Sequence, residues 1–329
     1  MISDCLDALS YSVFYSTFDI SSSFFQLGLA ECDRDKTAFV TRKGQFRWTV
    51  MPQGATNSPP IFSRLMSLVL RGLTYLSCLV FIDDCIVIDN SFDDHLANLE
   101  MVLQRFRYAN LKLKPKKCKM FQRRVRFLGH LVSAAGIEVD PDKTACIEAW
   151  EFPRNVSELR SFLGLCSYYR SYCPNFASVA EPLTEMLRKG VPVVVTERRI
   201  KAFNDLKHFL TTPPVLGVTR DEGLYYLDVD SSGSCAGACL QQMQDGVLRV
   251  LEYASRTFNK AEKAYCTTRR EMCALIFGLK HFRSYLLGQK FICRVDLQAI
   301  SFYKRNPNPV GQQARYLDLI AKCVSSAYW

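Results

Sequence analysis

The sequence has only four histidines and no Cys-x-x-C pair among its 14 cysteines. These counts argue against a zinc site, which needs clustered cysteine and histidine ligands. The cysteines are scattered, many of them within apolar segments, and this pattern favours reduced core thiols over disulfides. We therefore expect a reducing, intracellular location, in the cytoplasm or the nucleus.

Long hydrophobic runs are also absent. No apolar stretch reaches the roughly 18 residues that a membrane-spanning helix needs, and the N-terminus lacks the pattern of a signal peptide. We expect a soluble protein with no membrane partner. At 329 residues the chain is long enough for two or three domains, each with its own hydrophobic core.

Acidic residues are fewer than basic residues, 32 against 42, which gives a net charge of +10. A positive chain favours polyanionic partners, because lysines and arginines that neutralise phosphates release counterions on binding. One stretch is especially basic and contains Lys112, Lys114, Lys116, Lys117, Lys119, Arg123 and Arg124, followed by Arg126. Taken alone, such a run fits a solvated face as well as it fits contact with nucleic acid.

An acidic pair, Asp83-Asp84, lies between two apolar runs of β-forming residues at 78–82 and 85–88. Burying two carboxylates in a hydrophobic hairpin is costly unless a positive group neutralises them, and a divalent cation is the strongest compensator. An isolated Asp-Asp pair is most often a turn or a helix cap. The apolar flanks favour a metal site instead, because a solvent-exposed turn seldom lies between two apolar β-forming runs.

A third carboxylate is expected near this pair, because hard cations such as Mg²⁺ take oxygen ligands. Asp19 is the candidate, since it ends the run 13–18, which is rich in β-formers, and precedes Ile20 and three serines. The alternative is an ordinary strand-end or helix-cap residue. A strand-end aspartate beside a hairpin-tip Asp-Asp is the arrangement of a two-metal nucleotidyl-transfer centre.

Several motifs resemble a known family. The segment 81–84, Phe-Ile-Asp-Asp, is similar to the aromatic-x-Asp-Asp signature of reverse transcriptases. The residues around it resemble the polymerases of gypsy-class LTR retrotransposons. The resemblance continues through palm motifs at 14–29 and 51–54, a segment leading toward the thumb at 127–130, connecting helices at 158–170, and a ribonuclease H motif at 253–257. The chain thus resembles the reverse transcriptase/ribonuclease H region of a Pol polyprotein.

The patterns predict an α+β fold with three parts. Residues 1–139 are expected to form a reverse transcriptase palm with partial fingers, 140–214 a helical thumb and connector, and 215–329 a ribonuclease H-like domain truncated at its C-terminus. Strands are predicted at 224–230, 234–242 and 247–254, followed by a long helix at 262–287 and a strand at 290–295.

Two palm helices carry predicted apolar stripes. The first is opened by the segment 57–60, Asn-Ser-Pro-Pro, and presents Ile61, Phe62, Leu65, Met66, Val69 and Leu70. The second is capped by Ser91 and presents Leu96, Leu99, Leu103 and Phe106.

The ribonuclease H resemblance implies a second metal site formed by Asp230, Glu271 and Asp296. The alternative for Glu271 is a solvated helix charge, and Asp228, two residues before Asp230 on the same strand face, is a competing candidate. Asp296 is followed by Leu297, where the family more often has histidine. The family's fourth acidic residue is expected beyond Trp329, so we expect this centre to be incomplete.

Two further palm residues take roles from the resemblance. Phe24 matches the aromatic residue that crowds the sugar 2′ position and excludes ribonucleotides, and Gln53 matches a residue that contacts the incoming nucleotide. The alternatives are a core aromatic and a turn glutamine. Beside a polymerase centre, contact with a template–primer backbone becomes the better interpretation of the basic run at 112–126.

The resemblance implies an RNA-directed DNA polymerase with an attached ribonuclease H-type endonuclease. We expect two Mg²⁺ ions per site, with Mn²⁺ as an alternative, and as partners an RNA template, a DNA primer, RNA–DNA hybrid, dNTPs and other parts of a Pol polyprotein. The family's upstream fingers segment is expected to precede the chain. Two alternatives stay open: a catalytically inactive nucleic-acid-binding fragment, and a purely structural interaction module.

Overall fold

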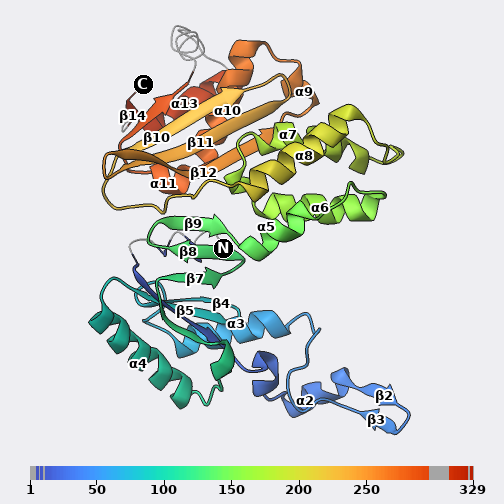
Figure 1. Cartoon of the computed structure of the whole chain (residues 1–329), viewed down its shortest axis with the longest axis vertical. Helices are drawn as coiled ribbons and strands as arrows, with labels where there is room; N and C mark the ends of the chain where they lie inside the picture. Colours follow the sequence, from blue (N-terminus) through green and yellow to red (C-terminus); the bar gives the residue numbers. More distant parts are fainter. Residues whose placement is uncertain (1–4, 7, 10–11, 296–310, 325–326, 329) are drawn as a thin grey trace. The chain divides into compact units, whose positions relative to one another are not determined.

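The structure is a computed structural model that describes residues 5–6, 8–9, 12–295, 311–324 and 327–328. The chain forms two compact units, Met1–Ile137 and Glu138–Trp329 (Figure 1). The predicted boundaries at residues 139 and 214 stay predictions, the second of them inside one compact unit. Among the described helices, none combines the length and the apolar character that a membrane crossing requires.

The first unit is built on a four-stranded sheet with the order β4-β5-β1-β6. Its strands are β1 (Phe14–Asp19), β4 (Cys78–Phe81), β5 (Asp84–Asp89) and β6 (Lys119–Gln122), and its two long helices are α3 (Ser58–Val69) and α4 (Phe92–Tyr108). β1 pairs antiparallel with both β5 and β6. This is the α+β palm that the sequence predicts.

Successive side chains of β5 point to opposite faces of the sheet, and a separate hydrophobic cluster covers each face. Cys85 and Val87 pack with Phe62 and Met66 of α3 and with residues of α4. On the other face Ile86 and Ile88 join a cluster with Tyr15, Leu79, Val125, Phe127 and Val132. A strand buried on both faces has a continuous apolar sequence, as found in β5.

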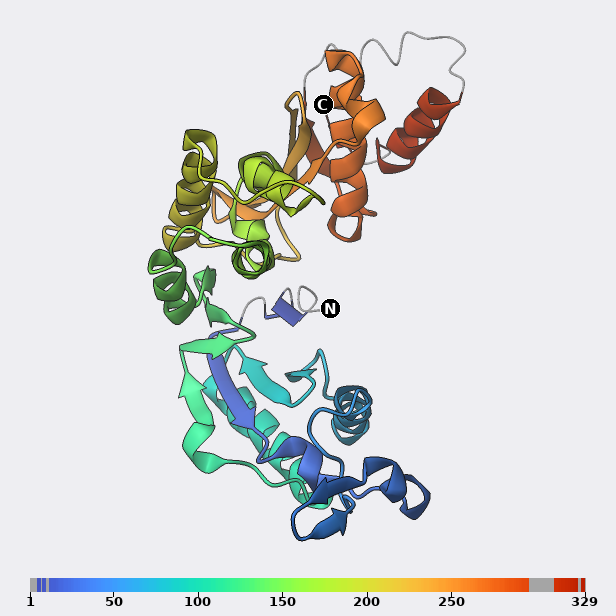
Figure 2. The same cartoon turned by 90° about the vertical axis from the view of Figure 1, so that its right-hand side faces the viewer.

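The remaining elements of the first unit are short. They are η1 (Ser23–Gln26), α2 (Glu31–Arg34), η2 (Asp35–Thr37), β2 (Phe39–Thr41), β3 (Gly44–Phe46), η3 (Pro115–Lys117), β7 (Arg124–Phe127) and β8 (His130–Ser133), with β9 (Gly136–Val139) crossing the boundary. The β2–β3 hairpin projects away from the four-stranded sheet in two perpendicular views (Figures 1 and 2). All six of its strand residues are exposed.

The predicted stripes on α3 and α4 are wrong at three positions. Ile61 is 50% exposed on α3, and Leu96 and Leu103 are 51% and 38% exposed on α4. The buried face of α4 instead carries His95 and Val102 with Leu99 and Phe106. The predicted cap is confirmed, because the Ser91 side chain accepts a hydrogen bond from the Asp94 backbone N–H at 3.1 Å.

His95 is fully buried because a hydrogen-bond network satisfies it. Its Nε2 lies 2.7 Å from Ser16 Oγ on β1, and its Nδ1 lies 3.0 Å from Asp89 Oδ2 on β5. Ser16 Oγ also accepts the Phe121 backbone N–H at 3.0 Å, so its own proton is available to His95 Nε2. A neutral ring that donates from Nδ1 to Asp89 and accepts at Nε2 from Ser16 satisfies all three side chains, and burial lowers the pKa of His95.

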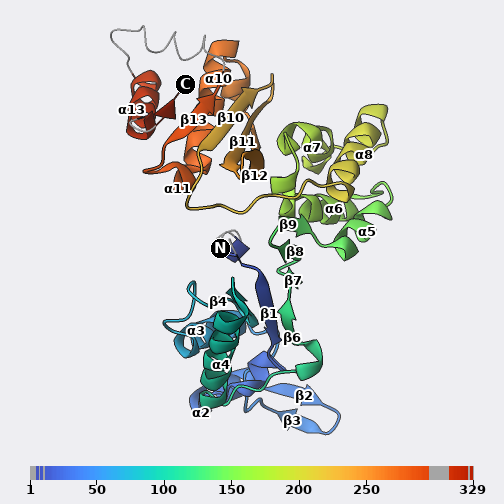
Figure 3. The same ribbon diagram turned by 60° about the vertical axis from the view of Figure 1, so that its left-hand side comes forward.

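The second unit joins a helical segment to a five-stranded sheet with the order β12-β11-β10-β13-β14 (Figure 3). The helical elements are α5 (Pro141–Glu148), α6 (Val156–Tyr168), η4 (Arg170–Tyr172), α7 (Phe176–Thr184), η5 (Glu185–Leu187) and α8 (Glu197–Thr211). The strands are β10 (Tyr225–Ser231), β11 (Cys235–Gln244), β12 (Val247–Thr257), β13 (Phe291–Arg294) and β14 (Ala327–Tyr328).

The predicted order of three antiparallel strands, a helix and a parallel strand is confirmed, since β10 pairs antiparallel with β11 and parallel with β13. The predicted long helix is divided into α9 (Lys260–Lys263), α10 (Thr267–His281) and α11 (Arg283–Leu286), and a further helix, α13 (Gln312–Val324), follows. α10 packs closely on β10, where Gly278 lies against Leu227 and Val229.

The helical segment is bonded to the sheet through a few polar groups. Arg170 donates to the Ser255 carbonyl oxygen, and the Ala177 backbone N–H donates to Ser255 Oγ at 2.9 Å. Glu181 on α7 accepts from Lys263 at 2.7 Å and from Ser234 at 3.0 Å. These bonds explain why Ser255, a polar residue, is only 2% exposed.

The network around His95 predicts a large stability effect. Replacing His95 with Ala should lower the free energy of unfolding by about 2–4 kcal/mol, because it leaves a cavity and removes one buried hydrogen-bond partner each from Ser16 Oγ and Asp89 Oδ2. Urea unfolding followed by circular dichroism measures this change. The control His281→Ala removes a half-exposed partner of Glu252 and should cost less than about 1 kcal/mol. A cost for His95→Ala as small as that of the control would contradict the role of the network.

Candidate active sites

The acidic pair lies at the tip of the β4–β5 hairpin. Phe81 pairs with Asp84, so Ile82 and Asp83 form a two-residue turn. Ile82 adopts φ 59°, a left-handed conformation that costs a β-branched residue about 1–3 kcal/mol. The turn therefore holds Asp83 and Asp84 at the end of the sheet at some cost in backbone strain.

Asp19 lies directly beside this tip. It is the last residue of β1 and pairs in register with Asp84, so both side chains leave the sheet on one face. Asp83 accepts a hydrogen bond from Ser23 Oγ at 3.1 Å, which ties the turn to η1. The structure thus brings the three predicted carboxylates to the same end of the palm sheet.

Like charges act on Asp84. Burial raises the pKa of this carboxyl group, and the neighbouring charges of Asp83 and Asp19 raise it further. Lys117 acts in the opposite direction, and its Nζ lies 3.1 Å from Asp19 Oδ2. One lysine thus offsets part of the repulsion among three carboxylates.

A cavity of about 200 Å³ opens beside these residues. Asp19 and Asp84 lie on its wall together with three cations, Lys117, Lys119 and Arg126. Such a lining combines oxygen donors for a cation with positive groups for phosphate oxygens.

The donor chemistry fits a divalent cation, because three carboxylates from two strand ends repel one another and a cation relieves that repulsion. Among the described residues, however, no three Asp, Glu, His or Cys side chains converge closely enough to hold a metal ion. The carboxylates share one end of the sheet, and Lys117 occupies one oxygen of Asp19.

The other predicted palm residues lie around this end. Phe24 on η1 is half-buried and packs edge-to-face on Phe62, with ring centroids 5.9 Å apart. Gln53 is exposed in the turn that leads into α3. The contacts of Phe24 agree with a core aromatic and leave its predicted role at the sugar as a prediction.

All seven predicted nucleic-acid-binding residues are exposed; they are Lys112, Lys114, Lys116, Lys117, Lys119, Arg123 and Arg124. They follow α4 through η3, β6 and the start of β7. Partners within the protein include Asp19, which binds Lys117, and the Phe14 ring, whose centroid lies 3.9 Å from the Arg123 guanidinium.

The second predicted site lies at the end of β10. Asp230 is exposed there, and Glu271 on α10 is only 7% exposed. Ser231, the residue after Asp230, donates from Oγ to Glu271 Oε1 at 2.7 Å, so Glu271 reaches the strand end that carries Asp230. The third predicted member, Asp296, lies outside the described residues. Two carboxylates at one strand end suit the oxygen preference of Mg²⁺.

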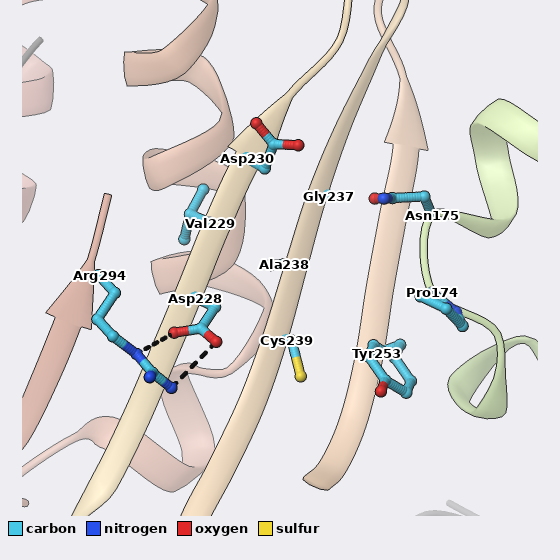
Figure 4. A pocket seen from close by; sticks show the side chains of 10 residues that line it. All are labelled: Pro174, Asn175, Asp228, Val229, Asp230, Gly237, Ala238, Cys239, Tyr253 and Arg294. Atoms are coloured by element: carbon cyan, nitrogen blue, oxygen red, sulfur yellow. Dashed lines mark hydrogen bonds and ion pairs between the residues drawn. The ribbon is translucent and has the colours of Figure 1, made fainter. Parts of the chain in front are cut away.

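Asp228 is distinguished from Asp230 by its partners. Arg294 on β13 binds both carboxylate oxygens of Asp228, at 2.5 and 3.1 Å (Figure 4). Gln241 also donates to one of these oxygens. Asp228 is therefore neutralised by a bidentate ion pair. This pairing favours Asp230 over Asp228 as the carboxylate available to a cation, and the metal-binding role of Asp230 stays a prediction.

Asp228 and Asp230 line a cavity of about 190 Å³ on the face of the sheet opposite α10 (Figure 4). Asn175 of the helical segment overhangs it, with its side-chain amide against Gly237, where any Cβ atom would overlap the amide. Gly237 is thus required by this close approach.

Sequence reasoning missed several residues around the two sites. Ser23, the ion pair of Lys117 with Asp19, Ser231 and Asn175 carry no local signal, because each acts on a residue at least 40 positions away. Arg126 had a signal, since it belongs to the predicted basic stretch, and the structure adds that it lines the palm cavity.

Comparisons with known proteins cover both units. Residues 2–132 match the family model described as reverse transcriptase (RNA-dependent DNA polymerase), and residues 195–293 match an RNase H-like domain found in reverse transcriptase. The chain is 36% identical over 319 residues to the Retrovirus-related Pol polyprotein from transposon opus of Drosophila melanogaster, covering 93% of this chain and 32% of that protein. It is 32% identical over 325 residues to the corresponding protein from transposon gypsy of the same organism, covering 95% and 31%.

The chain thus spans about a third of the length of these relatives. Among solved structures, it is similar to a foamy viral protease-reverse transcriptase in complex with dsDNA, with a TM-score of 0.85 and 21% identity, covering 100% of this chain and 69% of that one. The same viral protein with an RNA/DNA hybrid gives a TM-score of 0.77 at 22% identity, with 96% and 44% covered. At these identities the structures establish the fold.

The repulsion at the palm tip predicts a stabilising substitution. The raised pKa of Asp84 means that its ionisation is less favourable in the folded state, so wild-type stability falls as pH rises above the ordinary carboxyl range. Asp84→Asn should therefore raise the free energy of unfolding at pH 7, by less than about 1 kcal/mol because this carboxylate is only partly buried and solvent screens much of the repulsion.

Urea unfolding at pH 4 and pH 7 tests this sign, since the gain should be larger at pH 7. The control Asp205→Asn, on α8 of the other unit, removes a charge outside the cluster and should give no such gain. A loss of stability in Asp84→Asn at pH 7 would contradict the repulsion.

Proposed function

Residues 2–132 belong to the reverse transcriptase family and residues 195–293 to the ribonuclease H-like domains of reverse transcriptases, as in the Pol polyproteins of LTR retrotransposons, and from this premise we propose that the chain is an RNA-directed DNA polymerase. We further propose that its second unit hydrolyses RNA in RNA–DNA hybrids. The observation that carries the first proposal is the pairing of Asp19 with Asp84 beside Asp83 at the palm tip.

In this proposal Asp19, Asp83 and Asp84 hold two Mg²⁺ ions, with Mn²⁺ as an alternative. When bound, the ions would lower the pKa of the primer 3′-hydroxyl and neutralise charge on the transferring phosphoryl group. The residues of the chain supply the placement: Asp19 and Asp84 offer oxygens on one face of the sheet, and Asp83 is oriented by its bond from Ser23.

Positive side chains in the palm cavity would receive the phosphates. Lys119 and Arg126 line it, and Lys117 would exchange its bond to Asp19 for a phosphate oxygen when a cation takes its place. Phe24 is proposed to crowd the sugar 2′ position and so select dNTPs, and Gln53 to contact the incoming nucleotide.

The proposed nucleic-acid partners are an RNA template, a DNA primer and their hybrid. The solved relatives are complexes with dsDNA and with RNA/DNA hybrid, and this supports the proposal. The exposed basic residues 112–124 would bind the phosphate backbone and make binding weaker as salt increases. We also propose an intracellular location, in the cytoplasm or nucleus, because template and dNTPs are found there, and association with other parts of a Pol polyprotein.

In the second unit Asp230, Glu271 and Asp296 are proposed to hold the divalent cations for hydrolysis. The exposed carboxylate of Asp230 and the inward-reaching carboxylate of Glu271 lie at one strand end, which supports this assignment. The competing possibility is a nucleic-acid-binding fragment without catalysis, which predicts salt-sensitive binding alone.

Primer extension on an RNA template with Mg²⁺ and dNTPs tests the polymerase proposal. Asp19→Asn and Asp83→Asn should each abolish extension, because each removes a proposed metal ligand. Asp84→Asn should leave residual activity, since the family resemblance gives Asp84 a more supportive role. Near-wild-type extension by either of the first two variants would refute the assignment. Hybrid binding without extension by the wild type would favour the binding fragment.

Cleavage of an RNA–DNA hybrid tests the second site with a matched pair of variants. Asp230→Asn should abolish cleavage, whereas Asp228→Asn, on the same strand face, should retain most of it because Arg294 already neutralises that carboxylate. Gel analysis of a labelled RNA strand gives both rates. Equal loss in the two variants would contradict the distinction between them.

A further inference from the structure

Ser231 bonds the strand of Asp230 to the side chain of Glu271. It is the last residue of β10, and its hydroxyl donates to Glu271 Oε1 at 2.7 Å. Side chains alternate along the strand, so Ser231 faces α10 with Leu227 and Val229, while Asp230 points to the opposite face. The hydroxyl thus bonds one predicted metal ligand, Glu271, from the residue next to the other, Asp230, at the end of the strand.

A second bond holds the same turn to the same helix. Arg270, the residue before Glu271, donates from its guanidinium to the Gly233 carbonyl oxygen at 3.1 Å. Two consecutive residues of α10 therefore bond to this region, Glu271 to the last residue of β10 and Arg270 to the turn that follows it. The distance between the strand end and the helix is fixed independently of Ser231, which leaves the Ser231 hydroxyl to act on the orientation of the Glu271 carboxylate.

Orientation matters because Glu271 is only 7% exposed. A buried carboxylate requires hydrogen bonds, and a hydroxyl that donates to one oxygen restricts the rotation of the whole group. Groups that hydrogen-bond to the carboxylate ligands of a metal ion orient those ligands and so affect how tightly the site binds the metal. Their loss weakens metal binding about 10–100-fold.

We propose that Ser231 is a positioning residue for the divalent-cation site of Asp230 and Glu271. Its hydroxyl holds Glu271 at the end of β10 in the orientation that binds the cation. This inference rests on the ribonuclease H function proposed above. It adds a residue outside the predicted carboxylate set, and it assigns to that residue an effect on cation affinity rather than contact with the reacting atoms.

The test measures Mn²⁺ binding by electron paramagnetic resonance in the full chain. All variants carry Asp19→Asn and Asp83→Asn, so that the palm site does not contribute. Ser231→Ala should weaken Mn²⁺ binding by about 10-fold, and Ser231→Thr, which keeps the hydroxyl, should restore most of the affinity. Ser232→Ala is the matched control, because its hydroxyl bonds within the turn to Cys235 and not to Glu271. Thermal unfolding verifies that each variant is folded.

A double-mutant comparison shows whether Ser231 acts through Glu271. In a Glu271→Gln background, Ser231→Ala should cause no further loss of Mn²⁺ affinity. A purely structural bond predicts the reverse, namely lower thermal stability with unchanged affinity in Ser231→Ala.

Equal Mn²⁺ affinity of the parent chain and Ser231→Ala would overturn the inference whatever the cleavage assay gives, and so would a parent chain that binds no Mn²⁺. Hybrid cleavage by the chain with an intact Ser231 is measured separately. If cleavage is absent while Ser231→Ala still weakens Mn²⁺ binding, the positioning role stands and the proposed nuclease function fails.

Discussion

The side chains of β5 alternate between two buried faces, and this leaves the strand a single favourable register against β1. A shift of one residue would turn Ile86 and Ile88 from the face of Tyr15 to the face of the helices, and would exchange every other side chain of the strand as well. The candidate site in the palm depends on this constraint, because the same register sets Asp19 opposite Asp84. Packing far from the tip therefore determines which carboxylates meet.

The two candidate sites manage negative charge in different ways. In the palm, three carboxylates share one lysine, and the pKa of Asp84 is raised as a result. In the second unit, Asp228 is matched by Arg294 and Gln241, while Asp230 stays exposed. Charge that has been neutralised within the protein stabilises the fold, and charge left uncompensated is available for a ligand. The difference separates structural from functional carboxylates where residue type alone does not.

Much of this architecture could be predicted from the sequence, because strands, turns and caps depend on neighbouring residues. The hairpin around Asp83, the cap at Ser91 and the strand order of the second unit all have such local signals. The buried face of α4 could not be predicted correctly, since His95 is polar and its burial depends on partners 79 and 6 positions away. A hydrophobic pattern instead selected Leu96, which is exposed.

The candidate sites divide in the same way. The carboxylates themselves follow from motifs, but their partners Ser23, Lys117 and Ser231 come from distant segments, so that only the folded chain shows them. Motifs identify the groups that do chemistry, and tertiary structure identifies the groups that orient them. The site residues are therefore easier to predict than their state of charge or their orientation.

The bonds between Ser255 and the helical segment have a practical consequence for dissecting the protein. A fragment that begins at residue 215 would lose Arg170, Asn175 and Glu181 together, and would expose a serine, a glycine backbone and a lysine that are covered in the whole unit. The shortest piece suited to separate expression therefore starts near residue 138. The helical segment thus forms part of the same compact unit as the five-stranded sheet, and it covers polar groups that the sheet and its connections would otherwise expose to solvent.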